Sequence, residues 1–378
     1  MRILYVASDQ VVPGRTGGSV HVLEVARGLS ARGHEVHAVV HRADGAPDEE
    51  ERYGAHWHRI DWRPSHRLFR FRAQPAVSAL AERLRPDVVM ERYYNFGGEG
   101  VLAAAERRIP SLLEVNSPAV DHPGSLKAWL DALTLVRPLK RRRERLCALA
   151  AALVSPLDQI VPPAARAKTE AVTWGANVEA FSPERRSDEV RRALGIADKA
   201  IAVVFSGSFR PWHGLRVLDR AARLLRGRDD IVFVLIGADG IHPHGYRGIA
   251  LGSVPYQAMP EMLAAADIGV APYDPSRLHQ LRLGFYWSPL KIFEYMASGL
   301  PTITIDRSPL TELVREGEEG LHVPEGDAEA LAAAIRRLAD APELRAAMGA
   351  KARARVVEHY SWARHCEQLE RILQRIAS

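Results

Sequence analysis

Short runs of apolar residues alternate along the chain with longer stretches in which apolar residues recur at helical spacing. In the first half, the apolar runs predict strands at residues 2–7, 35–40, 87–90, 111–115 and 151–154. Helical spacing predicts helices between them, at about residues 20–31, 74–85, 98–108 and 137–149. Strands that alternate with helices favour a parallel sheet that is covered on both faces.

The same alternation starts again after an irregular, proline-containing stretch at residues 156–163. Apolar runs predict strands at residues 200–205, 231–236, 268–271 and 302–305. Helices are expected at about residues 213–226, 258–266, 289–298, 327–339, 343–358 and 361–376. We therefore expect an α/β protein with two Rossmann-like, doubly wound parallel-sheet domains, at residues 1–173 and 174–358, followed by a last segment at 359–378.

Length and composition agree with this organisation. A chain of 378 residues exceeds the usual size of one domain, and 47% hydrophobic with 26% charged residues excludes a wholly disordered protein. The two cysteines, Cys147 and Cys366, cannot form a disulfide framework or a paired zinc motif. A net charge of +5 without a basic track interleaved with aromatic residues gives little support for nucleic-acid binding.

The sequence predicts no membrane-spanning segment. The chain starts MRILYVASD, without an apolar signal core, and its longest apolar run, residues 146–154, is far shorter than the roughly 20 residues that cross a bilayer. We expect a soluble, cytoplasmic protein. The helix at 137–149 is basic and carries apolar Leu139, Leu146 and Leu149. It could contact the anionic inner face of a membrane, or it could be an ordinary helix with a solvated face.

The most informative stretch is SPLKIFEYMASGLP, from Ser288 to Pro301. Ser288 is a favoured N-cap, and Pro289 suits the first helical position. The free amides and the dipole at such a helix start form an anion site, so Lys291 in the first turn suits a bound diphosphate. Glu294, one turn later, could accept hydrogen bonds from ribose hydroxyls. A capped helix with surface charges is the alternative.

Two glycine-containing turns also follow predicted strands. In SGSFRPWHG, residues 206–214, Gly207 permits close backbone approach while Arg210 and His213 offer donors to an anion. The turn PGRTGG, residues 13–18, resembles phosphate-binding loops but lacks the ending of a P-loop. Each stretch could equally be a tight turn that binds no ligand.

Polar residues follow two strands of the first domain, in the stretches 91–95 (ERYYN) and 114–116 (EVN). Both stretches fall at the ligand edge of a parallel sheet, where a sugar or polyol could bind, although loop polarity explains them equally well. The histidines show no metal-ligand spacing and no G-x-S-x-G elbow is present, so we expect no metal site and no α/β-hydrolase.

Together these stretches resemble the family-four retaining glycosyltransferases of the GT-B fold, also described as glycosyl transferases group 1. The resemblance covers nearly the whole chain and is carried by residues 207–214 and 288–301, with support from 17–18, 174–181 and 259–272. It implies an N-terminal acceptor domain and a C-terminal nucleotide-sugar domain that face each other across a cleft. It also implies that the last helix crosses back onto the N-terminal domain.

The resemblance assigns roles to residues of this sequence. Lys291 and Arg210 would be the catalytic residues, because they would stabilise charge on the leaving diphosphate. The implied donor-binding residues are Gly18, Gly207, His213, Gly252, Val254, Ser288, Leu290 and Glu294. The expected acceptor-binding residues are Glu91, Tyr93 and Asn116.

The chain departs from the family's pattern at four positions. Tyr286 replaces the first glutamate of the E-x7-E motif, and Ser208 and His213 replace the arginine and lysine of the phosphate clamp. Asn116 replaces a histidine that is common in the first domain. The departures are compatible with a variant subgroup or with lost activity.

The reaction implied is transfer of a sugar from a nucleoside-diphosphate sugar, with UDP-sugars favoured, to an acceptor hydroxyl with retention of configuration. The acceptor would be a glycan, a lipid-linked molecule or a small molecule, and no cofactor is expected. Two alternatives stay open: another nucleotide-sugar enzyme of this fold, such as an epimerase, and a non-catalytic sugar-binding scaffold.

Overall fold

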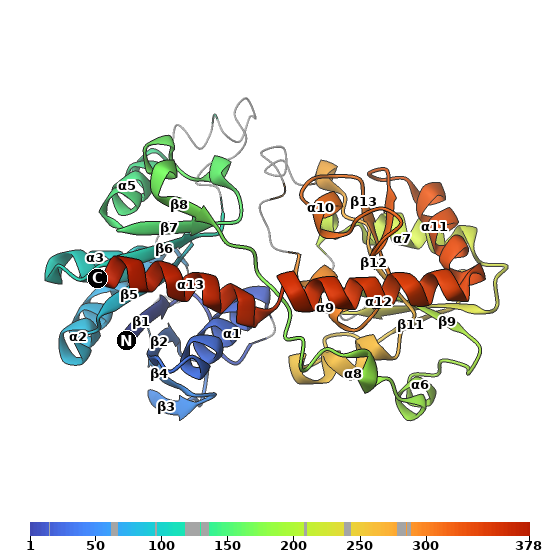
Figure 1. Ribbon diagram of the computed structural model, residues 1–378, viewed down its shortest axis with the longest axis horizontal. Helices are drawn as coiled ribbons and strands as arrows, with labels where there is room; N and C mark the ends of the chain where they lie inside the picture. Colours follow the sequence, from blue (N-terminus) through green and yellow to red (C-terminus); the bar gives the residue numbers. More distant parts are fainter. Residues whose placement is uncertain are drawn as a thin grey trace. The chain divides into compact units, whose positions relative to one another are not determined.

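The computed structural model describes residues 1–14, 16–61, 67–94, 97–117, 129, 136–207, 210–237, 243–277, 285 and 289–378. The chain divides into two compact units (Figure 1). The first unit contains Met1–Trp174 and Trp362–Ser378, and the second contains Gly175–Phe285 and Pro289–Ser361.

The first unit is built on an eight-stranded sheet in the order β3-β4-β2-β1-β5-β6-β7-β8. Strand β3 pairs antiparallel with β4, and the other neighbouring strands pair in parallel. The strands are β1 (Arg2–Ala7), β2 (Glu35–His41), β3 (Glu49–Arg52), β4 (Ala55–Ile60), β5 (Val88–Tyr93), β6 (Ser111–Val115), β7 (Ala152–Ser155) and β8 (Thr169–Ala171). The helices are α1 (Gly17–Ala31), η1 (Arg67–Ala73), α2 (Gln74–Leu84), α3 (Glu99–Arg107), α5 (Val136–Leu149), η2 (Asp158–Ile160), η3 (Pro163–Lys168) and α13 (Trp362–Ala377).

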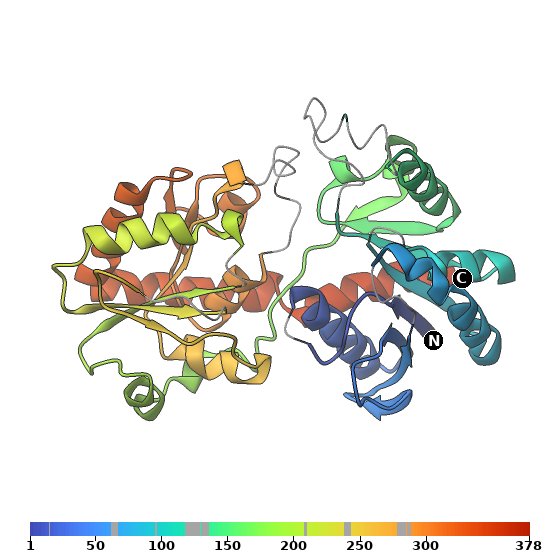
Figure 2. The same cartoon turned by 180° about the vertical axis from the view of Figure 1, so that it is seen from behind.

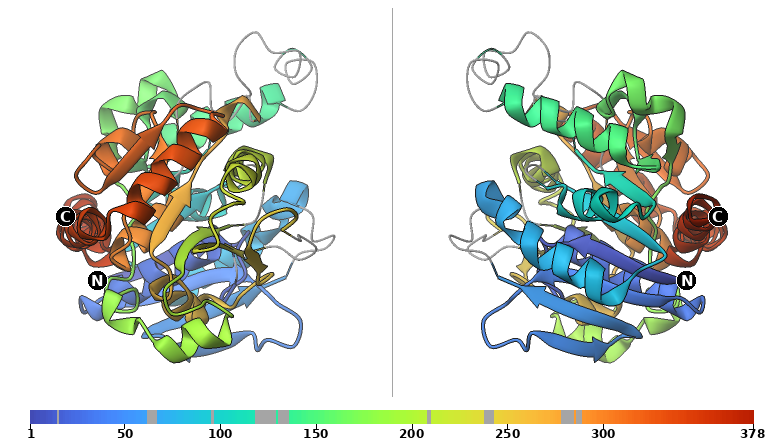
Figure 3. Two further views of the ribbon diagram at one scale, coloured as in Figure 1. Left: turned by 90° about the vertical axis from the view of Figure 1, so that its right-hand side faces the viewer. Right: turned by 90° about the vertical axis from the view of Figure 1, so that its left-hand side faces the viewer.

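Helices cover both faces of the first sheet. Successive side chains of β1 point to opposite faces, and the side chains on each face are largely apolar, so each face needs a covering layer. Leu4 and Val6 lie in one core with residues of α2 and α3, which pack side by side (Figure 3, right). Tyr5 faces the other way, toward His21 of α1. Helices α1 and α13 pack together there (Figure 1).

The second unit contains a six-stranded parallel sheet in the order β11-β10-β9-β12-β13-β14. Its strands are β9 (Ile201–Ser206), β10 (Ile231–Ile236), β11 (Gly248–Ala250), β12 (Ile268–Ala271), β13 (Thr302–Ile305) and β14 (Gly320–Val323). Its helices are η4 (Pro183–Arg185), α6 (Asp188–Ala193), η5 (Pro211–His213), α7 (Leu215–Leu224), η6 (Tyr256–Ala258), α8 (Met259–Ala264), η7 (Pro275–Arg277), α9 (Leu290–Ala297), α10 (Leu310–Leu313), α11 (Ala328–Asp340) and α12 (Pro342–His359).

Helices also cover both faces of the second sheet. Residues of α7 and α11 share one apolar core with β9, β10, β12, β13 and β14, and these two helices lie together in Figure 3, left. Helix α9 packs against α12, which is nearest the viewer in Figure 1, whereas α7 is nearest in Figure 2. On this side a Cβ on Gly269 of β12 would stand 2.6 Å from the Tyr295 ring, so α9 packs very close to the sheet.

The two doubly wound sheets confirm the predicted α/β fold class. The strands missed by the sequence pattern are β3, β4, β8, β11 and β14, which are short or carry polar residues such as those of EEER and AHWHRI. The expected helix start at Pro289 is wrong by one residue. Helix α9 begins at Leu290 and its N-cap is Pro289, not Ser288.

Helices α1 and α13 approach closely at Gly28, where a Cβ atom would collide with the sulfur of Cys366. We expect Gly28→Ala to lower the free energy of unfolding by about 1–3 kcal/mol through overpacking, despite the higher helix propensity of alanine. Chemical denaturation measures the change. In a Cys366→Ala background the same substitution should cost much less, because the sulfur is absent. An equal cost in both backgrounds would contradict this packing.

Candidate functional site

In the second unit, the carboxyl end of β9 and the first turn of α9 meet at Gly207. The Gly207 amide donates a hydrogen bond to the Ile236 carbonyl at 2.8 Å, and its φ of 148° favours glycine. A Cβ atom there would stand 2.7 Å from Lys291 Nζ and 3.1 Å from His213 Nδ1. The absent side chain therefore leaves open a space on which two basic groups converge.

Lys291 lies in the first turn of α9 and is only 8% exposed. Its Nζ atom has no hydrogen-bond partner among the described residues. The Nζ atom instead lies 4.2 Å from the ring centroid of Phe205 and 5.3 Å from that of Tyr273. Burial lowers the pKa of Lys291 to about 7, against the opposing effect of the Glu294 carboxylate.

His213 ends the short helix η5 and is buried to the same extent as Lys291. Its Nδ1 atom also has no hydrogen-bond partner in the described part of the chain. Burial, followed by the charges of Lys291 and Arg210, lowers the pKa of His213 to about 2. Near neutral pH this imidazole is therefore uncharged. Arg210, at the N-cap of η5, is exposed.

The start of α9 adds backbone donors to these side chains. The first amides of a helix have no partner within the helix, and the dipole makes this end positive. Pro289 at the N-cap makes no side-chain hydrogen bond to them. Leu290 opens the helix, and Glu294 lies one turn further along, where it is nearly buried. A lysine, a histidine and a helix start that converge in this way are suited to binding a phosphate or diphosphate.

The segment that contains Gly252 is connected to this site through Gly237. The Gly237 amide donates to the Gly252 carbonyl at 2.7 Å, and a Cβ on Gly237 would collide with the Gly207 carbonyl. Val254, two residues further along, is partly exposed. The structure thus brings most of the predicted donor residues of the second unit to one place. Ser288 lies outside the described residues.

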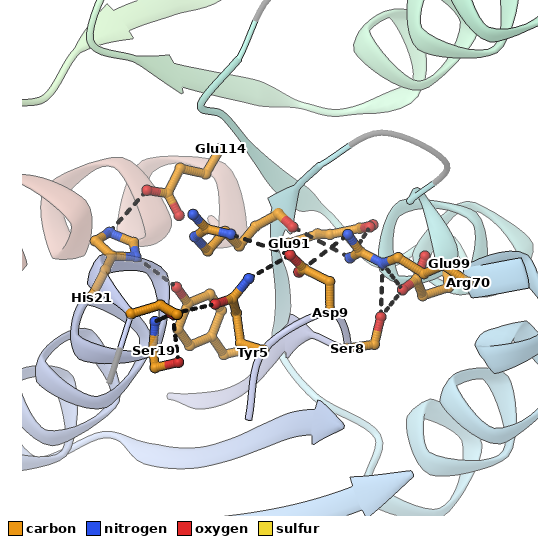
Figure 4. A network of polar contacts seen from close by, with 12 residues as sticks. Tyr5, Ser8, Asp9, Ser19, His21, Arg70, Glu91, Glu99 and Glu114 are labelled. Carbon is orange, nitrogen blue, oxygen red and sulfur yellow. Dashed lines mark hydrogen bonds and ion pairs between the residues drawn. The ribbon is translucent and has the colours of Figure 1, made fainter. Parts of the chain in front are cut away.

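In the first unit, charged side chains form a buried network at the carboxyl ends of β1, β5 and β6 (Figure 4). Arg70 Nε lies 2.6 Å from Glu99 Oε1, and Arg70 Nη1 lies 3.3 Å from Asp9 Oδ1. Asp9 also pairs with Arg92 at 3.6 Å. Gly18 lies beside the network, because a Cβ there would stand 3.2 Å from Arg92 Nη2. Its expected approach to donor phosphates stays a prediction.

The prediction that Glu91 and Tyr93 bind an acceptor needs correction. Glu91 has no exposed surface, and its carboxylate accepts hydrogen bonds from the amides of Gly98, Gly100 and Val101 at 2.6–2.9 Å. Glu91 therefore caps the N-terminus of α3. Tyr93 is equally buried and its ring lies 5.6 Å from the Arg143 guanidinium. Neither residue has a surface to offer a ligand.

Asn116 keeps hydrogen-bonding capacity. It is nearly buried, and its Nδ2 atom has no hydrogen-bond partner among the residues that the structure describes. Sequence reasoning placed Glu114 at this edge of the sheet but missed its contacts with other elements. His21 Nε2 lies 2.9 Å from Glu114 Oε1, and His21 Nδ1 lies 3.4 Å from the Tyr5 hydroxyl. The three residues come from separate elements, so no local motif could have identified these contacts.

The structure also corrects the expectation for α5. Leu139 and Leu146 are buried in the first unit, so they are not available for insertion into a membrane. Lys140, Arg141 and Leu149 are exposed. Among the described residues, no helix is both long enough and apolar enough to cross a bilayer.

Both halves of the chain match known families. Residues 200–341 match the family described as Glycosyl transferases group 1, and residues 16–170 match the Glycosyl transferase 4-like domain. A GDP-mannose-dependent monoacylated alpha-(1-6)-phosphatidylinositol monomannoside mannosyltransferase from Corynebacterium glutamicum is 30% identical over 212 residues. That match covers 53% of this chain and 54% of the relative, so the chain spans about half the length of this relative.

Solved structures share the fold along nearly the full chain. Sucrose-phosphate synthase from Thermosynechococcus elongatus superposes with a TM-score of 0.76 and 18% identity, over 99% of this chain and 98% of that one. The Anabaena protein HepE in complex with UDP and glucose superposes with a TM-score of 0.70 and 16% identity, over 99% of this chain and 100% of that one. These similarities establish the two-domain GT-B fold.

We expect Glu91→Ala to destabilise the protein rather than to alter ligand binding. The substitution leaves the amides of Gly98, Gly100 and Val101 without their acceptor and leaves Arg70 with one carboxylate fewer. The free energy of unfolding should fall by about 3 kcal/mol or more. Glu51→Ala, on the exposed strand β3, is the control and should change stability by less than about 0.5 kcal/mol. Equal stability of the two variants would argue against the structural role.

Proposed function

We propose that the chain is a group 1 glycosyltransferase of the GT-B fold that transfers a sugar from a nucleoside-diphosphate sugar to an acceptor hydroxyl with retention of anomeric configuration. One observation carries the proposal. Lys291 and His213 converge on Gly207 without a hydrogen-bond partner for Lys291 Nζ or His213 Nδ1 in the described part of the chain. Two buried basic groups with unused hydrogen-bonding capacity support the binding of an anion between them.

In the proposed reaction, the bond between the sugar and the diphosphate breaks and negative charge grows on the leaving diphosphate. Lys291, Arg210 and the amides at the start of α9 would stabilise that charge. His213 would add a hydrogen bond to a phosphate oxygen, and Glu294 would accept hydrogen bonds from ribose hydroxyls. We assign no protein group as a nucleophile.

The donor would occupy the second unit, with its base near the segment 252–254 and its diphosphate at Gly207. We favour a uridine nucleotide, and UDP is the nucleotide bound to the structurally similar HepE. The Corynebacterium relative is named for GDP-mannose, so guanosine nucleotides are the main competitor. Asn116 is the proposed acceptor contact in the first unit. Contact of α5 with an anionic membrane would rest on exposed charges such as Lys140 and Arg141, together with the exposed Leu149.

Thermal unfolding with UDP, GDP, ADP and dTDP, and with their sugars, tests the proposal. A ligand at 100 times its Kd adds about 2.7 kcal/mol of stability, which raises Tm by several degrees. A shift with one base only would support a donor site and identify the nucleotide. Conversion of the donor sugar without an acceptor would indicate the epimerase alternative. The absence of any shift at millimolar ligand would favour the non-catalytic scaffold.

We predict that Lys291→Ala weakens nucleoside-diphosphate binding at least tenfold and lowers kcat, because a charge-assisted contact to phosphate is lost. Lys351→Ala is the matched control, since Lys351 is exposed on α12 and pairs with Glu318 at 2.7 Å. Isothermal titration and a donor-turnover assay measure the two effects. Unchanged binding and turnover in Lys291→Ala would show that the diphosphate is not bound at this place.

We also predict that nucleotide binding takes up a proton. The pKa of Lys291 is about 7, so the amine loses its charge as pH rises above 7. A bound diphosphate favours the charged form and raises that pKa. Affinity should therefore fall between pH 7 and pH 9, by at most about tenfold per pH unit. Titration in buffers of different ionisation enthalpy counts the protons. Lys291→Arg, which stays charged, should flatten the dependence; the same slope in both proteins would contradict it.

A further inference from the structure

The surroundings of the Lys291 ammonium group differ from those of an ordinary buried lysine. Buried ammonium groups are normally paired with a carboxylate, whereas Lys291 Nζ has no hydrogen-bond partner among the described residues. Two aromatic rings lie against it, those of Phe205 and Tyr273. A ring face attracts a cation but accepts no conventional hydrogen bond, so contact with these two rings leaves the N–H groups of Lys291 available for a ligand.

The two rings have different origins. Phe205 belongs to β9 and is part of the apolar core of the second sheet, so its position is fixed by that core. Tyr273 lies just beyond the end of β12, outside the regular strand, and only 2% of it is exposed. The position of its ring is therefore determined by the side chains that contact it at the carboxyl edge of the sheet.

Tyr273 also contacts the turn that carries His213. Its ring stacks on Trp212 with a centroid distance of 5.8 Å and an interplanar angle of 16°, and it meets the His213 ring edge-on at 6.2 Å. It also packs edge-on against Phe285, with a centroid distance of 4.9 Å. The neighbouring Asp274 amide donates to the Trp212 carbonyl at 2.9 Å. One side chain thus contacts both basic groups of the site.

We propose that Tyr273 is a positioning residue for the donor diphosphate, because its ring face holds the Lys291 ammonium group at Gly207 while leaving its N–H groups free. The inference rests on the proposed donor site and goes beyond it. Tyr273 touches neither the donor nor the acceptor in this scheme; it acts through Lys291. A carboxylate in its place would also hold Lys291, but it would repel the diphosphate.

A series at residue 273 tests the inference in the full-length protein, with UDP and inorganic pyrophosphate as probes. Tyr273→Phe keeps the ring face and should bind within about twofold of the wild type. Tyr273→Leu removes the ring face and should bind about tenfold more weakly. Tyr246→Leu, which removes a ring packed on Phe233 elsewhere in the unit, is the control and should bind as the wild type does.

Replacement of Tyr273 by pentafluorophenylalanine separates the electrostatic role from packing, and it stays informative if Tyr273→Leu does not fold. Fluorination keeps the shape of the ring but reverses the charge of its face, so the affinity should fall as in Tyr273→Leu. Affinity equal to that of Tyr273→Phe would overturn the inference, because a purely structural ring would tolerate the change.

A double-mutant cycle then shows whether Tyr273 acts through Lys291. In a Lys291→Met background, the loss caused by Tyr273→Leu should shrink from about tenfold to less than twofold. An undiminished loss would overturn the inference and leave the donor site intact. A wild-type protein that binds neither nucleotide nor pyrophosphate would overturn the donor site and the role of Tyr273 together.

Discussion

The Lys291 ammonium group gives up most of its hydration without gaining a hydrogen bond to any residue that the structure describes, and much of the second unit can be understood from that constraint. Burial of an unpaired charge is unfavourable, and the depressed pKa of Lys291 expresses this cost directly. Two aromatic ring faces next to Nζ limit this cost, and the Glu294 carboxylate one turn away opposes the lowering of the pKa. This arrangement keeps the site electropositive, so that an anion can complete it.

The fold supplies the place for this unusual charge. A parallel sheet with both faces buried has little room for polar groups along its strands, so they gather where the strands end. In the second unit, the end of β9 leads into Gly207, the end of β12 leads to Tyr273, and α9 starts at the same edge. In the first unit, the corresponding edge holds the network of Asp9, Arg70 and Glu114.

The sequence anticipates the parts of the molecule that depend on local pattern. Apolar runs identified most strands, and the spacing around Gly207 and Lys291 identified residues that converge in the structure. Glu91 shows the limit of this reasoning. In the sequence, a glutamate near the end of a strand looks the same whether it binds a ligand or caps the following helix. Only the three amides that donate to Glu91 in the structure show that it caps α3. Tyr273 was invisible because its role depends on Lys291, which follows 18 positions later in the chain.

The contact between Gly28 of α1 and Cys366 of α13 has a consequence for how the protein is made. Helix α13 belongs to the first unit but follows the whole of the second unit in the chain. On the ribosome, the first unit therefore emerges with one apolar surface of α1 uncovered, and it stays so while the second unit is synthesised. Domains generally fold in order of synthesis, from the N-terminus onward. Here the first domain to appear is completed only after the second unit has been made, and the nascent chain exposes that surface until α13 is synthesised.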